Sequence, residues 1–189
     1  MTYKSKKKND NQKIIFTGPV GVGKTTAIAA VSDIDILKTD VKATDIAIKI
    51  KSHDHTTIAM DYGLMYLDNG DRIDLFGTPG QERFDFMWDI LTIGGLGLIL
   101  LIDDSRPNSL KDLEFFLNAF KSFLKDAPVV IGITKMDISN HRTLDHYTDY
   151  LKTTKFANTP IMEVDARKAD DIKMLLMSLL FFLYPGLED

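Results

Sequence analysis

The chain has 189 residues, of which 44% are hydrophobic and 26% charged, and its formal net charge is −4 at pH 7. This length and composition suit one folded domain with its own core, and the weak negative charge argues against general nucleic-acid binding. The absence of cysteine excludes disulfides, thiolate metal sites, cysteine catalysis and prenylation, and it fits a cytoplasmic protein.

The N-terminus, MTYKSKKKND, is polar and basic, and no apolar stretch of the kind found in a signal peptide follows it. We expect residues 1–10 to be a disordered basic tail; the alternative is that its lysines are attracted to an acidic membrane or partner. Residues 11–189 are expected to form a single domain. The apolar run MLLMSLLFFLY near the end is too short to span a bilayer, so no stable membrane insertion is predicted.

An apolar strand, KIIF, leads into the stretch TGPVGVGKTTAI, which then continues as a helix. Strand, glycine-rich loop and helix in this order predict a phosphate-binding loop of the form G-x-x-x-x-G-K-[ST]. Its backbone N–H groups would face phosphate oxygens, Lys24 would reach the β- and γ-phosphates, and the Thr25 hydroxyl would ligate Mg²⁺. This loop predicts a nucleoside triphosphate but does not separate GTP from ATP. The predicted phosphate-binding residues are Gly18, Val20, Gly21, Val22, Gly23, Lys24, Thr25 and Thr26.

A long polar segment, DIDILKTDVKATDIAIKIKSHDH, follows this helix and contains no arginine. It is the best candidate for a moving segment that partners recognise, and the alternative is an extra surface element with no special role.

The rest of the chain alternates buried strands with helices, which predicts a parallel α/β sheet. We expect a P-loop NTPase three-layer fold: a mostly parallel central sheet with one antiparallel edge hairpin and helices on both faces. In such sheets the ligand lies at the carboxyl ends of the strands. The expected elements are a hairpin over 61–76 around Asp68-Asn69-Gly70, a helix over 82–91, a strand over 96–105, a helix over 109–124, a strand over 127–134, a helix over 140–152, a strand over 159–166 and a C-terminal helix.

Two polar motifs follow the last two predicted strands, and both could recognise the base of the bound nucleotide. In TKMD, the Asp137 carboxylate could accept hydrogen bonds from guanine N1 and the 2-amino group, and adenine offers no matching pair of donors. The alternative is an ordinary polar turn after a strand. In VDARK, the backbone N–H of Ala166 could meet guanine O6.

Taken together, these motifs resemble those of the Ras-like small GTPases over most of the chain after Lys13. The resemblance rests on GPVGVGKTT, TTIAMDYG, FGTPGQERF, TKMD and DAR. The stretch TIAMDYG followed by GQERF is similar to the Rab pattern. The combination of GTPGQERF with VDAR is similar to prokaryotic Ras-like GTPases of the MglA group.

The resemblance implies further roles. Thr57 would ligate Mg²⁺ together with Thr25, Gly80 would bind the γ-phosphate through its N–H, and Gln81 would orient the attacking water. It also implies GTP and GDP as ligands, slow hydrolysis that a partner accelerates, and effector and activator proteins, among them a roadblock/LC7-type partner. The implied catalytic residues are Gln81, Lys24 and Gly80, and the implied base-side residues are Thr134, Lys135, Asp137, Asp165, Ala166 and Arg167.

The sequence also departs from the family pattern. Gly77 stands where Ras-like proteins carry the Asp that supports Mg²⁺, and Asp74 of DLFG should point to the opposite face of its strand. Thr134 replaces the usual Asn, which is expected to weaken a tether. Asp103 resembles a Walker B carboxylate, so a P-loop ATPase or nucleotide kinase is an alternative. Gly77 leaves a non-hydrolysing nucleotide-bound scaffold as another.

Overall fold

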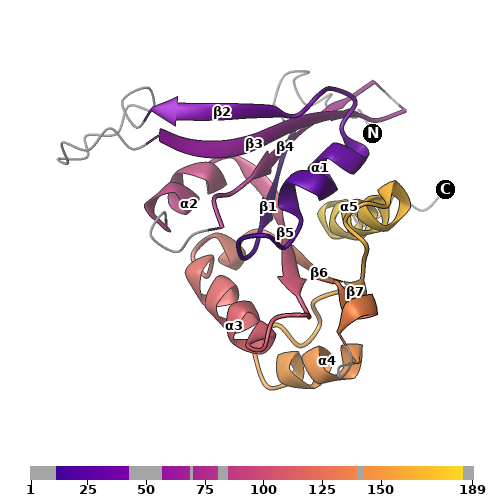
Figure 1. The fold of residues 1–189 in the computed structure, drawn as a ribbon. Coiled ribbons are helices and arrows are strands. Elements are labelled where there is room, and N and C mark those ends of the chain that lie inside the picture. The colour runs from indigo at the N-terminus through magenta and orange to yellow at the C-terminus, as the bar shows by residue number, and fades with distance from the viewer. Residues whose placement is uncertain (1–11, 43–56, 69, 81–84, 140–142, 185–189) are drawn as a thin grey trace, which may run out of the picture.

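The computed structural model of the chain describes residues 12–42, 57–68, 70–80, 85–139 and 143–184 (Figure 1). One seven-stranded sheet with the order β2-β3-β4-β1-β5-β6-β7 forms its centre. The elements are β1 (Gln12–Thr17), α1 (Lys24–Val31), β2 (Leu37–Lys42), β3 (Thr57–Tyr66), β4 (Arg72–Gly77), α2 (Asp85–Thr92), β5 (Gly95–Asp103), α3 (Ser109–Ala119), the short 3₁₀ helices η2 (Phe123–Lys125) and η3 (Met136–Ile138), β6 (Val129–Thr134), α4 (Leu144–Lys152), β7 (Ile161–Glu163) and α5 (Ala169–Leu183).

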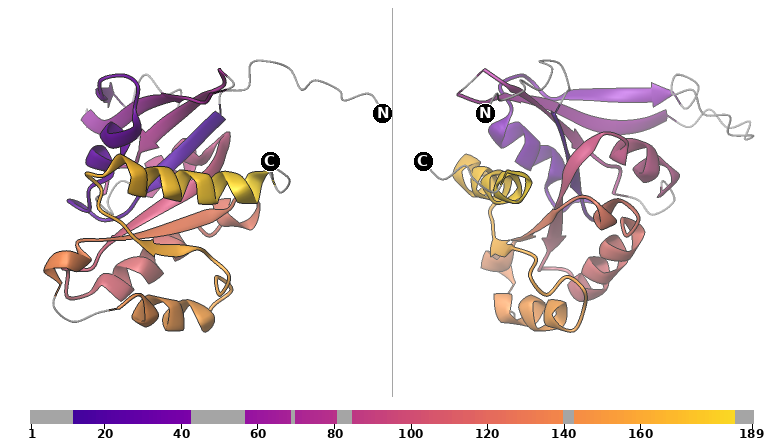
Figure 2. Two further views of the ribbon diagram at one scale, coloured as in Figure 1. Left: turned by 90° about the vertical axis from the view of Figure 1, so that its right-hand side faces the viewer. Right: turned by 180° about the vertical axis from the view of Figure 1, so that it is seen from behind.

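The sheet confirms the predicted fold class. β4, β1, β5, β6 and β7 are parallel to one another, whereas β3 runs antiparallel to both β2 and β4. The two further views in Figure 2 show β2 and β3 at the end of the sheet far from α4. Because β1 lies between β4 and β5, the loop after it opens at the middle of the carboxyl edge, where several strand ends can contribute side chains.

The two larger of three apolar clusters in the described residues cover the two faces of the sheet, as the continuous apolar strands predict. Successive residues of β5 point to opposite faces, so Ile99 and Leu101 pack in the core beneath α1 and α5. Leu98, Leu100 and Ile102 pack on the other side, with side chains from α2, α3 and α4. The helices in Figure 1 accordingly form one layer on each side of the sheet.

The edge of the sheet differs from the expectation. Part of the long polar segment forms strand β2, which pairs with β3 from Leu37 opposite Tyr62 to Lys42 opposite Thr57. The antiparallel region is therefore a three-stranded unit rather than one hairpin. The sequence LKTDVK alternates between strand-forming and charged residues, and this period of two is the signal for an edge strand. Residues 43–56 lie outside the described residues.

Three helix boundaries also differ from the expectation or lie outside the described residues. α3 ends at Ala119 instead of continuing to Leu124, and a separate 3₁₀ turn, η2, follows it. Residues 82–84, expected at the start of one helix, lie outside the described residues, so α2 is described from Asp85. The helix expected from residue 140 begins only at Leu144, because Thr143 before it is an extended N-cap; residues 140–142 lie outside the described residues.

The turn of the β3–β4 hairpin, predicted around Gly70, is confirmed and provides a test of the backbone. Gly70 has a φ of +82°, and a side chain there would meet nothing within 4 Å. We expect Gly70→Ala to lower the free energy of unfolding by about 1 kcal/mol, because the left-handed conformation is costly for alanine. Gly70→Asn should lose less, since asparagine tolerates this conformation. Urea unfolding of both variants checks this, and equal losses would contradict it.

Candidate nucleotide-binding site

The loop between β1 and α1 has the backbone that a phosphate loop requires. Gly18, Gly21 and Gly23 all have positive φ, at +139°, +77° and +109°. A Cβ at Gly18 would lie 2.1 Å from the carbonyl oxygen of Leu101, so the loop also runs too close to β5 for any side chain at this position. Glycine is thus required at Gly18 by both conformation and space.

Lys24 places a positive charge inside this loop. Its side chain is buried, and its Nζ donates hydrogen bonds of 2.8 Å to the carbonyl oxygens of Gly18 and Pro19. Burial lowers the pKa of Lys24 to about 8, although the charge of Asp61 acts in the opposite direction. α1 begins with no side-chain cap and no acidic residue in its first turn, so its N-terminal N–H groups also favour an anion.

The turn after β4 brings Gly80 to the same loop. The backbone N–H of Thr78 donates to the carbonyl oxygen of Phe16 over 2.9 Å, which ties the turn to the end of β1. A Cβ at Gly80 would lie 2.7 Å from the backbone nitrogen of Val20 and 2.8 Å from Lys24 Nζ. The structure therefore brings Gly80 and Lys24 together, whereas Gln81 lies outside the described residues.

An aspartate that the sequence analysis missed lies beside Thr25. The Thr25 hydroxyl donates a 2.5 Å hydrogen bond to Oδ2 of Asp61, on β3. Asp61 is opposite Gly77 in the β3–β4 pairing, and a Cβ at Gly77 would lie 3.2 Å from this same oxygen. The Asp61 carboxylate thus occupies the space beside the glycine that replaces the expected Asp. The sequence contains this residue within TIAMDYG, but only the strand register reveals its position.

Asp74 faces away from this site, as its place in β4 predicts. Its Oδ1 accepts a 2.8 Å hydrogen bond from the hydroxyl of Tyr62, and Arg72 forms an ion pair with it at 3.2 Å. Asp74 is buried in these contacts on the opposite side of the sheet from Gly77.

Thr57 is not brought to Thr25 by the strand that contains it. It is the first residue of β3, its backbone pairs with Lys42, and its side chain is outside the described part of the structure. Thr57 precedes Asp61 by four residues, which in a strand corresponds to about 13 Å. Within the described ranges, no group of three or more histidine or acidic side chains could hold a metal ion.

The first base motif is bound directly to the phosphate loop. The Thr134 hydroxyl lies 3.2 Å from the carbonyl oxygens of Val22 and Ile102 and can donate to either, so threonine keeps a tether at this position. Lys135 has a φ of +60°, and its Nζ donates to the carbonyl oxygen of Gly21 over 3.0 Å. Asp137 follows on η3 as an exposed carboxylate.

Asp103, the last residue of β5, also stabilises the first base motif. Its Oδ2 forms a 2.5 Å ion pair with Lys135 Nζ. Its Oδ1 accepts hydrogen bonds from the backbone N–H of Ser105 over 3.0 Å and from the Ser105 hydroxyl. Both oxygens of this buried carboxylate therefore hold the loops around the base motif.

The second base motif also meets the phosphate loop. A Cβ at Gly23 would lie 2.8 Å from the Cβ of Ala166, so the backbone of Gly23 packs against the Ala166 methyl group. Arg167 donates to both oxygens of Asp165, and these hydrogen bonds hold the pKa of Asp165 well below its usual range. The pKa of Arg167 is raised, first by its hydrogen bonds to Asp165 and also by the charge of Asp137.

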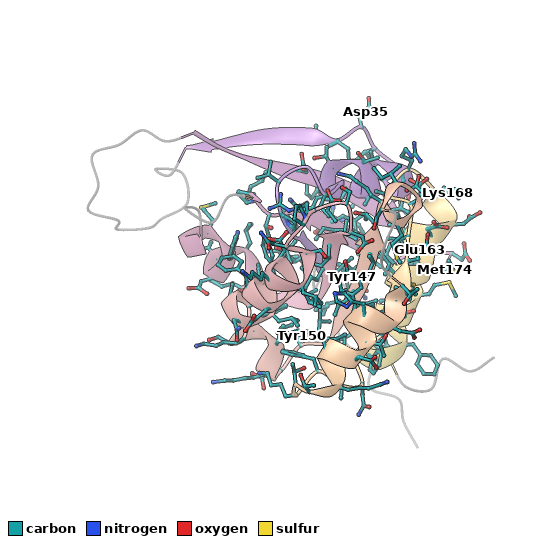
Figure 3. All side chains as sticks on the ribbon, turned by 60° about the horizontal axis from the view of Figure 1, so that its bottom comes forward. Asp35, Tyr147, Tyr150, Glu163, Lys168 and Met174 are labelled. Carbon is teal, nitrogen blue, oxygen red and sulfur yellow. The ribbon has the colours of Figure 1, made fainter. Side chains whose placement is uncertain are left out.

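A buried polar cluster supports the first base motif from the side of α4. Tyr147, which lies between α4 and the body of the protein in Figure 3, contacts the carboxylate of Asp104 and, at 2.7 Å, the hydroxyl of Ser109. The Ser139 hydroxyl donates to the other oxygen of Asp104. Ser139, two residues after Asp137, is thereby joined through Asp104 to Tyr147 of α4, which also contacts Ser109 of α3.

Comparison with known proteins places the chain in a family. Residues 35–182 match a family described as conserved hypothetical ATP binding protein. The chain belongs to this family. An uncharacterized protein of Methanocaldococcus jannaschii is 31% identical to it over 140 residues, which cover 74% of this chain and 80% of that protein.

Members of small-GTPase families are more distant relatives. Ras-like protein 1 of Saccharomyces cerevisiae is 29% identical over 111 residues, which cover 57% of this chain and 35% of that protein. Ras-related protein RABA1h of Arabidopsis thaliana is 25% identical over 191 residues, or 97% and 79% of the two chains. The family member described here is thus related at a distance to Ras and Rab proteins, consistent with the P-loop GTPase superfamily.

In the described part of the chain, no helix has the length and apolar character needed to cross a membrane.

The tether at Thr134 can be tested by removing its hydroxyl. Thr134→Val keeps nearly the same volume but loses the hydrogen bond to Val22 or Ile102, so we expect a loss of about 1 kcal/mol in the free energy of unfolding. Binding of a fluorescent GDP should weaken several-fold, because the tether connects the base motif to the phosphate loop. Thr134→Ser is the control and should retain nucleotide affinity. If Thr134→Val has the same stability in urea and the same GDP affinity as the parent, the hydrogen bond of Thr134 contributes to neither.

Proposed function

We propose that this protein is a GTP-binding molecular switch that slowly hydrolyses GTP to GDP with Mg²⁺. The observation that carries this proposal is that both base motifs contact the phosphate loop: Thr134 and Lys135 through hydrogen bonds, and Ala166 through direct packing. A nucleotide whose phosphates lie along Gly18–Thr25 would then have its base between Asp137 and Ala166. In this proposal residues 11–189 form a single GTPase domain.

The choice of GTP over ATP rests on Asp137. A carboxylate here can accept two N–H groups from guanine, and adenine would leave it without these partners. The description of the family mentions ATP, and its match begins after the phosphate loop but includes both base motifs. Guanine specificity is therefore the part of the proposal that most needs an experiment.

The contacts of Asp103 support a GTPase over the alternative of a P-loop ATPase or nucleotide kinase. A Walker B carboxylate has to be available to the metal side of the nucleotide. Both oxygens of Asp103 are engaged, one by Lys135 and the other by Ser105, and the side chain is buried. Asp103 accordingly supports the base motif rather than a metal ion.

The oxygen ligands near Thr25 fit Mg²⁺. Thr25 and Asp61 offer a hydroxyl and a carboxylate within 2.5 Å of each other, and Mg²⁺ prefers hard oxygen ligands from few side chains together with phosphates and water. When bound, Mg²⁺ would neutralise charge on the β- and γ-phosphate oxygens. We assign Thr25 as a direct ligand and Asp61 as the carboxylate that replaces the one missing at Gly77. Thr57 could join them only in a different backbone arrangement.

The rate of hydrolysis should be low without a partner. In the described part of the chain each arginine forms an ion pair: Arg72 with Asp74, Arg106 with Asp112 and Arg167 with Asp165. None of these three lies beside Gly80 and Lys24. An arginine supplied to the transition state contributes roughly 10³ to 10⁵ in rate, so an activator protein is part of the proposal. A roadblock/LC7-type partner, as in MglA-like proteins, is the candidate that the sequence resemblance suggests.

The switch itself would depend on the γ-phosphate. Gly80 lies beside Lys24, where its N–H could bind this phosphate, and Gln81 would orient the attacking water. Thr57, at the start of β3, would contact the same phosphate from the segment between α1 and β3. Only contacts that differ between GTP and GDP can shift a conformational equilibrium.

Nucleotide competition tests the proposed base specificity. We expect GTP and GDP to displace a fluorescent GDP at least about 100-fold better than ATP does, because ATP leaves Asp137 unpaired. Asp137→Asn should lose more than about tenfold in guanine affinity and gain affinity for xanthine nucleotides, since the amide supplies an N–H donor. The matched control is Asp145→Asn, an exposed aspartate on α4. Competition by ATP equal to that by GTP would contradict the proposal.

A pair of aspartates tests the assigned Mg²⁺ support. Asp61→Asn keeps the shape of the side chain but removes the charge. The factor by which Mg²⁺ slows GDP release should therefore be about tenfold smaller than in the parent, as for other residues that support metal ligands. Asp74→Asn should lower thermal stability, because it weakens the contacts with Tyr62 and Arg72, yet leave the Mg²⁺ dependence intact. GDP release is measured over a Mg²⁺ titration and in EDTA. The same Mg²⁺ dependence in all three proteins would rule out the role of Asp61.

A further inference from the structure

The only tryptophan of the chain, Trp88 on α2, holds the turn that contains Gly80. Its side chain is buried, and its indole Nε1–H donates a 3.1 Å hydrogen bond to the carbonyl oxygen of Pro79. This bond joins α2 to the residue directly before Gly80. The motif FGTPGQERF does not reveal this hydrogen bond, since Trp88 lies eight positions after Gly80 and outside the motif.

The geometry of the peptide bond gives this contact a consequence for Gly80. The Pro79–Gly80 peptide is trans, since the described residues contain no cis peptide bond. In a trans peptide the C=O and the following N–H lie in one plane and point in opposite directions. A donor that holds the Pro79 oxygen therefore also fixes the direction of the Gly80 N–H, which is the group proposed to bind the γ-phosphate.

The indole can hold this oxygen because aromatic packing fixes its own position. The rings of Trp88 and Phe120 are stacked with centroids 5.2 Å apart. Phe116 lies at 5.4 Å, and Phe115 meets the indole edge-on at 6.0 Å. Phe115 and Phe116 lie on α3, and Phe120 is the residue after it. The indole N–H is therefore held by side chains of the helical layer that packs against the sheet, and not by a surface loop.

Each residue of the turn is held by a different element. Thr78 is bound to the end of β1 through the carbonyl oxygen of Phe16. Pro79 is bound to Trp88 of α2, and Gly80 lies against Val20 and Lys24 of the phosphate loop. If Gly80 moved away from the phosphates, the Pro79–Gly80 peptide would have to rotate. This rotation would break the hydrogen bond from Trp88 to the Pro79 oxygen and leave a buried indole N–H without an acceptor, which is costly.

We propose that Trp88 is a positioning residue for recognition of the γ-phosphate: through Pro79 it directs the Gly80 N–H toward the terminal phosphate of GTP. This role rests on the proposed GTP-binding function. It predicts an effect on one nucleotide and not on the other, because GDP lacks the phosphate that Gly80 would contact. A residue that merely stabilised the fold would affect the binding of both.

The test compares Trp88→Phe with the parent. Phenylalanine keeps an aromatic ring among Phe115, Phe116 and Phe120 but has no N–H donor. Affinities for GDP and for a non-hydrolysable GTP analogue are measured by titration. We expect GDP affinity to change by less than about twofold and affinity for the GTP analogue to fall about five- to tenfold, the range for loss of one hydrogen bond.

A matched control separates this role from packing. Phe116→Leu disturbs the same aromatic group and leaves the indole donor in place, so it should lower thermal stability without altering the ratio of GTP-analogue to GDP affinity. Because the chain has one tryptophan, the parent protein also provides a single indole N–H signal in NMR. This proton should exchange with solvent more slowly with the GTP analogue than with GDP, a measurement that requires no variant to fold.

The outcomes distinguish the two levels of the proposal. If the parent protein binds no guanine nucleotide, the proposed function is wrong and this role of Trp88 is wrong with it. If the parent binds both nucleotides but Trp88→Phe weakens them equally, or leaves their ratio unchanged, only the role of Trp88 is overturned. Equal indole exchange in both nucleotide states would overturn it as well.

Discussion

A buried ammonium group organises this site. Burying a charge is costly unless it is paired and hydrogen-bonded, and the carbonyl oxygens of Gly18 and Pro19 give Lys24 the hydrogen bonds but not an opposite charge. These two oxygens can turn toward the ammonium because the glycine backbone of the loop is curled. Burial lowers the pKa of Lys24 to about 8, so at neutral pH the charge is retained but poorly solvated. A phosphate would supply the partner that water would otherwise have provided.

The phosphate loop is also the framework to which the base motifs are attached. Val22 and Gly21 accept hydrogen bonds from Thr134 and Lys135, and Gly23 is in contact with Ala166. The distance between the proposed phosphate site and the proposed base site is therefore set by contacts within the protein. Such preorganisation lowers the ordering cost of binding. The Asp103 carboxylate adds rigidity, since it holds Lys135 against β5.

The sequence predicted those features that depend on neighbouring residues along the chain. The glycine loop, the buried strands and the turn at Gly70 all carry local signals, and strand alternation was enough to place Asp74 on the wrong face for a metal. Asp61 was missed because its role depends on lying opposite Gly77, which only the β3–β4 register determines. Trp88 was missed for the same kind of reason: its partner, Pro79, precedes it by nine residues and belongs to a turn outside its own helix. For β2 the alternating pattern was present but short.

The position of Asp61 limits how the site can respond to a nucleotide. In the usual arrangement the supporting carboxylate stands on the strand equivalent to β4, next to the turn that ends in Gly80. In the proposed assignment this carboxylate is Asp61 on β3, the strand whose first residue is Thr57. While Thr57 remains paired with Lys42, about 13 Å of strand separates it from Asp61. The two residues can therefore serve one Mg²⁺ only if the first residues of β3 leave the sheet. Because β2 pairs with that same end of β3, the added edge strand opposes this movement.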